Sequence, residues 1–220
     1  MENYNFRKAN ENDIPFLAEL IIAAEKSNTN KLSYATLFNL TEAEVKLLIE
    51  NMLKEEIDGF EFSINSYLIA EFNNEPVAGF GAWIEAFENN KPSSLLKANL
   101  INYTFSKGSK QFLKNKAHFV QELLISRESF TLQFEYLFVL ENHRNKGISD
   151  TLIKKLEENY LLIFSSLKKA QVQVFSNNVG AIKVYKKNGF QIVKSFKSHN
   201  IETLDYLPFN EKYLMEKTYN

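Results

Sequence analysis

The stretch Phe134–Ser149, FEYLFVLENHRNKGIS, decides the fold of this chain. An apolar run typical of a β-strand ends at Leu140, a polar turn follows, and an amphipathic helix begins near Ile148. The first N–H groups of a helix have no partners inside it, and the helix dipole favours an anion there. A strand, a cationic turn and a helix N-terminus therefore make a site suited to a phosphate group.

The turn contains the residue types that such a site needs. Gly147 lets the backbone approach a ligand closely, and Arg144 and Lys146 add positive charge. The spacing excludes a P-loop, because Lys146 precedes Gly147 and no Gly-Lys-Ser/Thr follows. The three glycines of the dinucleotide fingerprint are absent too. From the turn alone, a basic surface turn before a helix is an equally good interpretation.

The patterns on both sides of this stretch predict an α/β or α+β chain on a mixed sheet. Expected strands cover 4–8, 66–72, 77–85, 131–140, 170–175, 191–197 and 213–218, and expected helices begin at residue 12 or 13 and cover 41–58, 148–164 and 178–187. Turn residues between the second and third strands indicate an antiparallel hairpin. Gly79 and Gly81 within that hairpin indicate a bulge or a close backbone approach.

Residues 87–130, which precede the central strand, are harder to interpret. Their apolar residues predict two helices with a break near Lys107-Gly108. No linker divides the chain, so a single domain over residues 1–220 is expected, with these helices as an insertion at about 87–130.

The composition bounds the function. With 220 residues, 45% of them hydrophobic and 24% charged, the chain is typical of a globular protein. A net charge of −1 gives no general attraction for nucleic acid. The absence of cysteine excludes thiol catalysis and disulfides, and three isolated histidines predict no metal site. Without a signal peptide or an apolar run of bilayer length, a cytoplasmic location and no membrane partner are expected.

Two segments resemble motifs of the GNAT superfamily of N-acetyltransferases. Leu137–Ser149 is similar to the family's strand and turn, with Arg144 at its Arg/Gln position and Gly147 at its central glycine. Ser149 departs from the pattern, because the family usually has Gly or Ala there. Ser176–Phe190 resembles the family's next helical segment, whose fixed positions hold Asn178, Ala181, Tyr185, Gly189 and Phe190. The closing stretch Tyr213–Lys217 is similar to the last strand of many members.

The resemblance implies a mixed, mostly antiparallel central sheet flanked by helices, with the helical insertion before the central strand. It also implies acetyl-CoA as the co-substrate, with no metal. The implied cofactor contacts are Leu137, Phe138 and Val139 on the central strand, Arg144, Asn145, Lys146, Gly147, Ile148 and Ser149 at the turn, and Asn178, Ala181 and Tyr185 beyond it.

The reaction that the resemblance implies is direct attack of a primary amine on the thioester. Tyr185 is then the candidate acid for the CoA thiolate, because a phenol stays protonated at neutral pH. The alternative for Tyr185 is a packing role. Glu135 shares a strand face with Leu137 and is the first candidate base, and Glu122 is the second. A water chain in place of either carboxylate is also consistent with the sequence.

Other functions remain open at this stage. The chain is expected to be an acetyl-CoA-dependent N-acetyltransferase acting on a small-molecule or peptide amine. The alternatives are an acyl-CoA-binding or sensing domain without turnover, and an interaction module on a similar core. For the insertion, a lid over the acceptor pocket and a helical pair that packs on the core or forms a homodimer contact are equally favoured.

Overall fold

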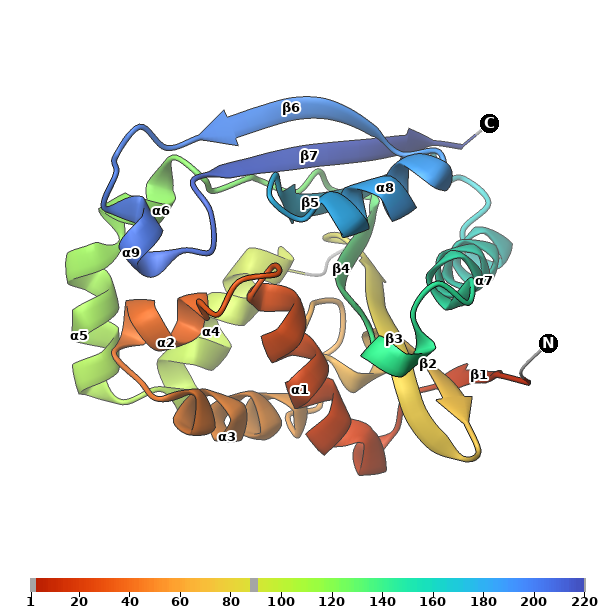
Figure 1. Cartoon of the computed structure of the whole chain (residues 1–220), viewed down its shortest axis with the longest axis horizontal. Coiled ribbons are helices and arrows are strands. Elements are labelled where there is room, and N and C mark those ends of the chain that lie inside the picture. The colour runs from red at the N-terminus through yellow and green to blue at the C-terminus, as the bar shows by residue number, and fades with distance from the viewer. Residues whose placement is uncertain (1–2, 88–90, 220) are drawn as a thin grey trace.

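The computed structural model of the chain describes residues 3–87 and 91–219. Its seven-stranded sheet has the order β1-β2-β3-β4-β5-β7-β6 (Figure 1). The strands are β1 (Asn5–Lys8), β2 (Tyr67–Phe72), β3 (Glu75–Ile84), β4 (Leu132–Val139), β5 (Lys169–Phe175), β6 (Gln191–Lys197) and β7 (Glu211–Thr218). Within the described sheet β4 and β5 pair in parallel and the other neighbours pair antiparallel. The prediction of a mixed, mostly antiparallel sheet is confirmed.

Helices cover both faces of this sheet. They are α1 (Ile14–Glu25), α2 (Ser33–Phe38), α3 (Glu42–Leu53), α4 (Ser93–Thr104), α5 (Lys107–Lys116), α6 (His118–Gln121), α7 (Ile148–Ile163), α8 (Val179–Lys187) and α9 (Thr203–Tyr206). One hydrophobic cluster joins α1, α2 and α3 to one face, and a second joins α7 and α8 to the other. Residues of β4 divide between the two clusters, with Phe134 in the second and Tyr136 in the first. Residues two apart in a regular strand share a face, so the side of β4 that faces each cluster changes between these two residues.

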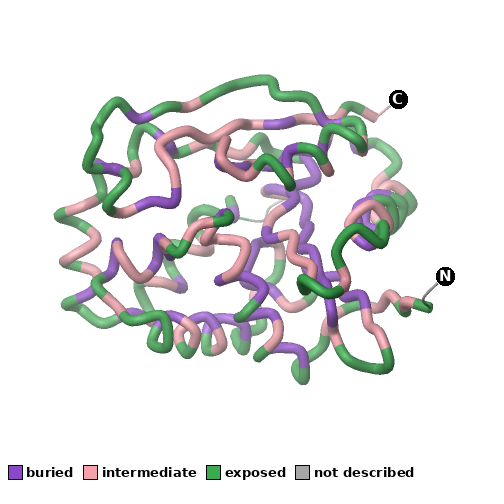
Figure 2. Tube along the Cα trace, in the orientation of Figure 1, coloured by how far each residue is buried: buried purple, intermediate pink, exposed green. Residues whose placement is uncertain are grey.

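Burial along the chain follows this arrangement. Figure 2 shows buried backbone through the central strands and exposed backbone along β6, the edge strand beyond β7. Among the described residues, no helix has the length and apolar character that crossing a bilayer requires.

A bulge in β4 separates it from β5. Gly79 pairs with Phe138 and Gly81 with Glu135, so two residues of β4 lie opposite one residue of β3. The first of the two, Tyr136, has a left-handed φ of 60°. Pairing between β4 and β5 covers only Leu132–Phe134 of β4, so beyond these residues the two strands diverge.

The two glycines of β3 are required by this close packing. A Cβ on Gly79 would lie 2.6 Å from Leu20 Cδ1, and one on Gly81 would lie 3.0 Å from the carbonyl oxygen of Glu135. The prediction of a bulge or close approach at these glycines is confirmed.

Several element boundaries differ from the predicted ones. The break expected near Lys107-Gly108 is confirmed, but it lies at Phe105-Ser106: Ser106 caps α5 by accepting a hydrogen bond of 3.1 Å from the N–H of Ser109, so Gly108 lies inside that helix. The helix expected over 41–58 ends at Leu53, where its apolar stripe ends. Neither α2 nor α9 was expected, because both are too short to show a periodic pattern. Residues 88–90 of the expected insertion lie outside the described residues.

Charge anchors the insertion to the sheet. Glu61, which is fully buried, lies 3.0 Å from Lys97 Nζ in α4 and 3.6 Å from Arg127 Nη2. Arg127 also donates a hydrogen bond of 2.7 Å to Glu135 Oε2 on β4. Burial raises the pKa of Glu61, but the charges of Lys97 and Arg127 outweigh it and hold this pKa below its usual value.

The variant Arg127→Met tests this anchor. It leaves two carboxylates without their shared partner, so we expect the free energy of unfolding at pH 7 to fall by about 3–5 kcal/mol. In the control Lys46→Met, which removes an exposed pair with Glu19, a loss of at most about 1 kcal/mol is expected. Chemical denaturation measures both variants. Similar small losses in the two would contradict a structural role for the buried cluster.

The stabilisation that Glu61 gains from its ion pairs with Lys97 and Arg127 depends on pH. Because the pKa of Glu61 is lowered in the folded state, its stabilisation is fully present above the ordinary value of 4.5. It is lost as the pH falls through the lowered value. The difference in stability between wild type and Arg127→Met should therefore shrink at acidic pH.

Candidate functional site

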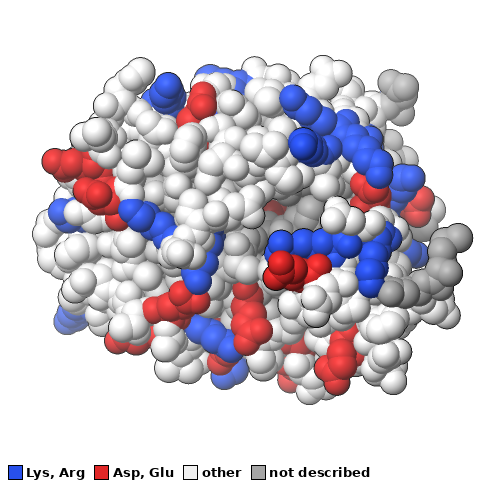
Figure 3. Space-filling view, in the orientation of Figure 1, with Lys and Arg blue, Asp and Glu red and all other residues white. Residues whose placement is uncertain are grey.

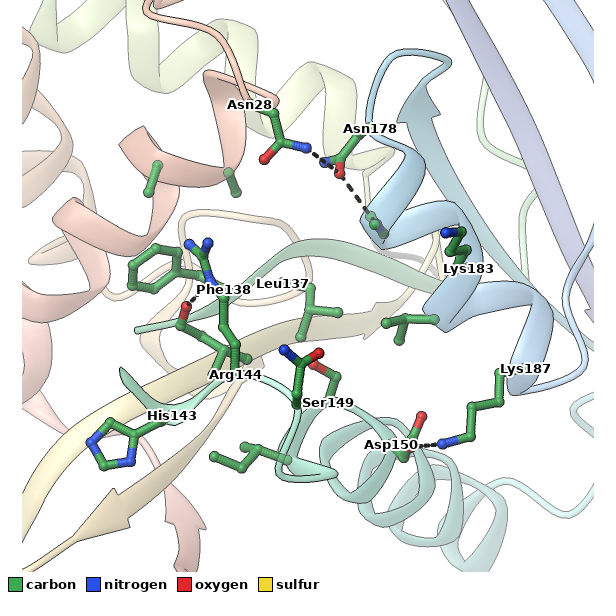
Figure 4. A pocket seen from close by; sticks show the side chains of 18 of the residues that line it. Asn28, Leu137, Phe138, His143, Arg144, Ser149, Asp150, Asn178, Lys183 and Lys187 are labelled. Carbon is green, nitrogen blue, oxygen red and sulfur yellow. Dashed lines mark hydrogen bonds and ion pairs between the residues drawn. The ribbon is translucent and has the colours of Figure 1, made fainter. Parts of the chain in front are cut away.

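A cavity of about 720 Å³ lies between the C-terminal end of α1, the end of β4 and the starts of α7 and α8 (Figure 4). Its lining includes the predicted residues Leu137, Phe138, Val139, Arg144, Asn145, Gly147, Ile148, Ser149, Asn178 and Ala181. Two of the predicted cofactor contacts do not line this cavity. Lys146 lies on the turn without lining the cavity, and Tyr185 lines a second, smaller cavity. The structure thus brings together segments that lie far apart in the sequence, from Ala23 to Lys187.

The turn before α7 presents backbone donors to the larger cavity. Gly147 caps α7 with a left-handed φ of 78°, a conformation that glycine adopts without strain. The first N–H groups of α7 therefore open onto the cavity beside Ile148 and Ser149. Arg144 Nε donates a hydrogen bond of 3.1 Å to the carbonyl oxygen of Val139, which fixes the guanidinium at the cavity wall (Figure 4).

Positive charge surrounds this helix N-terminus. Lys26 in the chain after α1, and Lys183 and Lys187 in α8, line the cavity along with Arg144. Figure 3 shows basic side chains along the rim of a hollow on this face of the molecule. The cavity can therefore hold a polyanion with its charge on the N-terminus of α7. The sequence motif missed the α8 lysines, although their spacing of four residues places them on one helix face.

Asp150, an acidic residue beside the turn, is engaged by α8. Lys187 pairs with its carboxylate, and Asn188 Nδ2 donates to it at 2.8 Å. Burial raises the pKa of Asp150, but the hydrogen bonds from Lys187 and Asn188 outweigh burial and lower it below its usual value. Its charge is thus compensated before any anion enters the cavity.

Asparagine contacts close one side of the cavity. Asn178 Oδ1 accepts hydrogen bonds from Ala181 N at 3.2 Å, which caps α8, and from Asn28 Nδ2 at 3.0 Å. Asn177 Nδ2 donates to the carbonyl oxygen of Ser27 at 2.9 Å. The end of α1 is therefore tied to the β5–α8 turn. Asn28 was missed from the sequence, because its partner is 150 residues away.

A second cavity of about 70 Å³ continues from the first, sharing Leu137, Asn178 and Ala181 with it. Both predicted catalytic residues, Tyr185 and Glu135, line it.

Tyr185 is buried with its ring against Phe80 and Phe190, at centroid distances of 6.2 Å and 5.9 Å. Burial and, next, the charge of Glu135 raise the pKa of Tyr185 well above its usual value. The phenol is therefore protonated at neutral pH.

The other residues of the small cavity were missed from the sequence. They include Glu25 at the end of α1, Gln173 on β5 and Lys212 on β7. Glu122, the second candidate base, lies outside both cavities and accepts a hydrogen bond of 2.6 Å from Ser198 Oγ. The insertion contributes no described residue to the lining of either cavity. Within the described residues, no group of three or more His, Cys, Asp or Glu side chains forms a metal-binding cluster.

Comparison with known proteins identifies a family that matches this chain. Residues 35–190 match the model of the acetyltransferase (GNAT) family. No curated protein matches the chain in sequence.

Solved structures share the fold at low identity. An N-acetyltransferase from Staphylococcus aureus Mu50 is 16% identical with a TM-score of 0.60, covering 96% of this chain and 99% of that one. Arabidopsis thaliana NAA60, in complex with a bisubstrate analogue, is 15% identical with a TM-score of 0.55, covering 99% and 100%. The yncA protein of Salmonella typhimurium, with its cofactor acetyl-CoA, is 12% identical with a TM-score of 0.52, covering 99% and 94%. The family model spans most of this chain and includes both motif segments, so the chain belongs to the GNAT family of acetyltransferases.

Proposed function

We propose that the chain transfers an acetyl group from acetyl-CoA to a primary amine. The observation that carries this proposal is the continuity of the two cavities. The larger has a cationic helix N-terminus suited to a pyrophosphate, and the smaller contains a protonated tyrosine and carboxylates. Leu137, Asn178 and Ala181 line both, so a thioester at their junction would face both sets of groups.

The donor would be held mainly by backbone. The pyrophosphate would lie on the N–H groups at the start of α7, beside Arg144. The pantetheine arm would follow β4 at Leu137–Val139, where β5 has diverged and no longer pairs with that strand. Backbone groups left without a strand partner need other hydrogen bonds, and the amides of the arm would supply them.

The reaction would need no covalent enzyme intermediate. The amine nitrogen attacks the thioester carbonyl carbon, and an N–H group near Leu137 or Phe138 stabilises the developing oxyanion. Collapse of the tetrahedral intermediate breaks the carbon–sulfur bond. Holding amine and thioester side by side supplies much of the acceleration.

Two protons must move in this reaction. Tyr185 would donate to the leaving thiolate, because its raised pKa keeps the phenol protonated at neutral pH. A carboxylate of the small cavity would accept the proton of the amine. Glu135 is the first candidate, with Oε2 held by Arg127, and Glu25 is the other carboxylate that lines the cavity.

Free-thiol release from acetyl-CoA across a panel of amines tests the proposal, with a direct titration of acetyl-CoA in parallel. We expect binding, and release that depends on the amine. Binding without release on any amine would favour a sensing domain instead. Absence of binding would leave only an interaction module on this fold.

Tyr185→Phe tests the acid. The phenylalanine ring keeps the packing against Phe80 and Phe190, so acetyl-CoA affinity should stay the same. We expect kcat to fall about 10²-fold or more, because the thiolate then leaves unprotonated. Stopped-flow thiol release measures kcat. Unchanged turnover in a variant that still binds acetyl-CoA would remove this role from Tyr185.

Gly147→Ala tests the turn. A Cβ at Gly147 would meet no atom within 4 Å, so the effect comes from the left-handed φ alone. Because alanine at this φ costs about 1–2 kcal/mol, we expect a lower melting temperature and weaker CoA binding. The control Gly108→Ala lies inside α5, where alanine favours the helix, and should leave both unchanged or improved. Equal behaviour of the two variants in thermal unfolding and CoA titration would refute the argument.

A further inference from the structure

Two charged side chains of opposite sign, Glu25 and Lys212, line the small cavity, and neither forms a salt bridge with a described residue. Glu25 Oε1 accepts a hydrogen bond of 3.0 Å from the neutral Tyr136 hydroxyl, and no described residue forms an ion pair with Glu25. Lys212 Nζ lies 4.5 Å from the ring centroid of Phe175 and likewise has no ion pair among the described residues. Burial lowers the pKa of Lys212, and the charges of Glu25 and Glu135 offset this effect only in part.

The neighbouring charges are already matched. Arg127 pairs with Glu135 at 2.7 Å, and Lys97 pairs with Glu61 at 3.0 Å. Gln173, another polar side chain of the lining, donates from Nε2 to the carbonyl oxygen of Ile125 at 3.1 Å.

A charge that is removed from water without a partner is destabilising, and a ligand of opposite charge offsets that cost. The cavity therefore fits a ligand that brings a positive group to Glu25 and a negative group to Lys212.

The size of the cavity limits the ligand. At about 70 Å³, this cavity has about a tenth of the volume of the larger one, at about 720 Å³. Only the reacting end of an acceptor fits there, so its two charges must lie within a few bonds of each other. Free amino acids have this arrangement, and polyamines and protein lysine side chains do not.

Two aromatic residues of the cavity lining are part of a buried hydrophobic cluster. These residues, Tyr136 and Phe175, belong to the same hydrophobic cluster as Leu207, next to α9. The segment containing α9 is held against α2 by a hydrogen bond of 2.5 Å from Thr36 Oγ1 to the carbonyl oxygen of Tyr206. This arrangement disfavours an extended polypeptide as the acceptor.

We propose that the acceptor is a small zwitterionic amine of the amino-acid type, with its amino group at Glu25 and its carboxylate at Lys212. This inference rests on the proposed function. The amino group loses a proton, its nitrogen forms the new bond to the acetyl carbon, and the carbon–sulfur bond breaks to give CoA thiol. The carboxylate takes no part in bond making and serves recognition alone.

Matched acceptors test the proposal. For a panel of amino acids, thiol release is measured with each amino acid, its amide and the corresponding amine without the carboxylate. Wild type should favour the amino acid by about tenfold or more in kcat/KM, as expected for one charge-assisted contact. In Lys212→Met the KM for the amino acid should rise, so that the three acceptors become nearly equal. The control Lys194→Met, at an exposed position of β6, should keep the wild-type preference.

Two results would overturn the proposal. One is a wild-type enzyme that acetylates the amides or plain amines as well as the amino acids. The other is a Lys212→Met enzyme that loses kcat equally on all three acceptors, which would mean that Lys212 acts in the chemistry. Thermal unfolding and CoA titration show whether the variant is folded, and Lys212→Arg should recover part of the preference if the charge is what matters.

The proposed function and this inference fail differently. If acetyl-CoA binds and no amine is acetylated, the proposed function fails, and calorimetric titration of the amino acids into the CoA-bound protein decides the inference. Binding to wild type and loss in Lys212→Met would support a zwitterion site. No binding to wild type would reject it.

Discussion

The left-handed backbone of Tyr136 is the constraint on which the rest of the site depends. At a φ of 60°, a residue other than glycine costs about 1–2 kcal/mol. The conformation persists because the ring is buried against α1 and its hydroxyl donates to Glu25. It inserts the extra residue that turns β4 away from β5, and the gap between the strands becomes the place for a ligand. One hydrogen bond thus links the opening of the sheet to the position of the Glu25 carboxylate in the small cavity.

Much of the lining of the larger cavity could be predicted from sequence, because it comes from one short stretch of chain. Arg144, Gly147 and the start of α7 are consecutive, and the phosphate-binding property comes from a helix N-terminus that any suitable turn creates. The bulge or close approach at Gly79 and Gly81 could be predicted for a similar reason, because a side chain at either position would collide with its neighbours. The sheet type followed from the order of strands and helices. Short helices such as α2 and α9 have too few residues for a periodic signal.

The lining of the small cavity was not predictable, because its groups come together only in the folded chain. Glu25, Gln173 and Lys212 lie on α1, β5 and β7, and no motif relates them. Glu135 was found only because the alternation of a regular strand predicts that it shares a face with Leu137. Its partner Arg127 comes from the insertion. The sequence of that segment showed apolar residues typical of packed helices, but no catalytic or binding motif. Where the backbone supplies the interaction, local sequence is informative, and where separate side chains supply it, the tertiary structure is needed.

The insertion itself is better understood as a support than as a lid. It reaches the small cavity through contacts with lining residues: Arg127 holds Glu135, and the carbonyl oxygen of Ile125 holds Gln173. Both contacts fix side chains on strands that have begun to separate, where sheet pairing no longer limits their position. The ion pairs of Glu61 then tie the same segment to the core. With Glu135 and Gln173 held in this way, the charges left for the proposed acceptor are those of Glu25 and Lys212, so the insertion would shape recognition of that acceptor although none of its described residues lines the cavity.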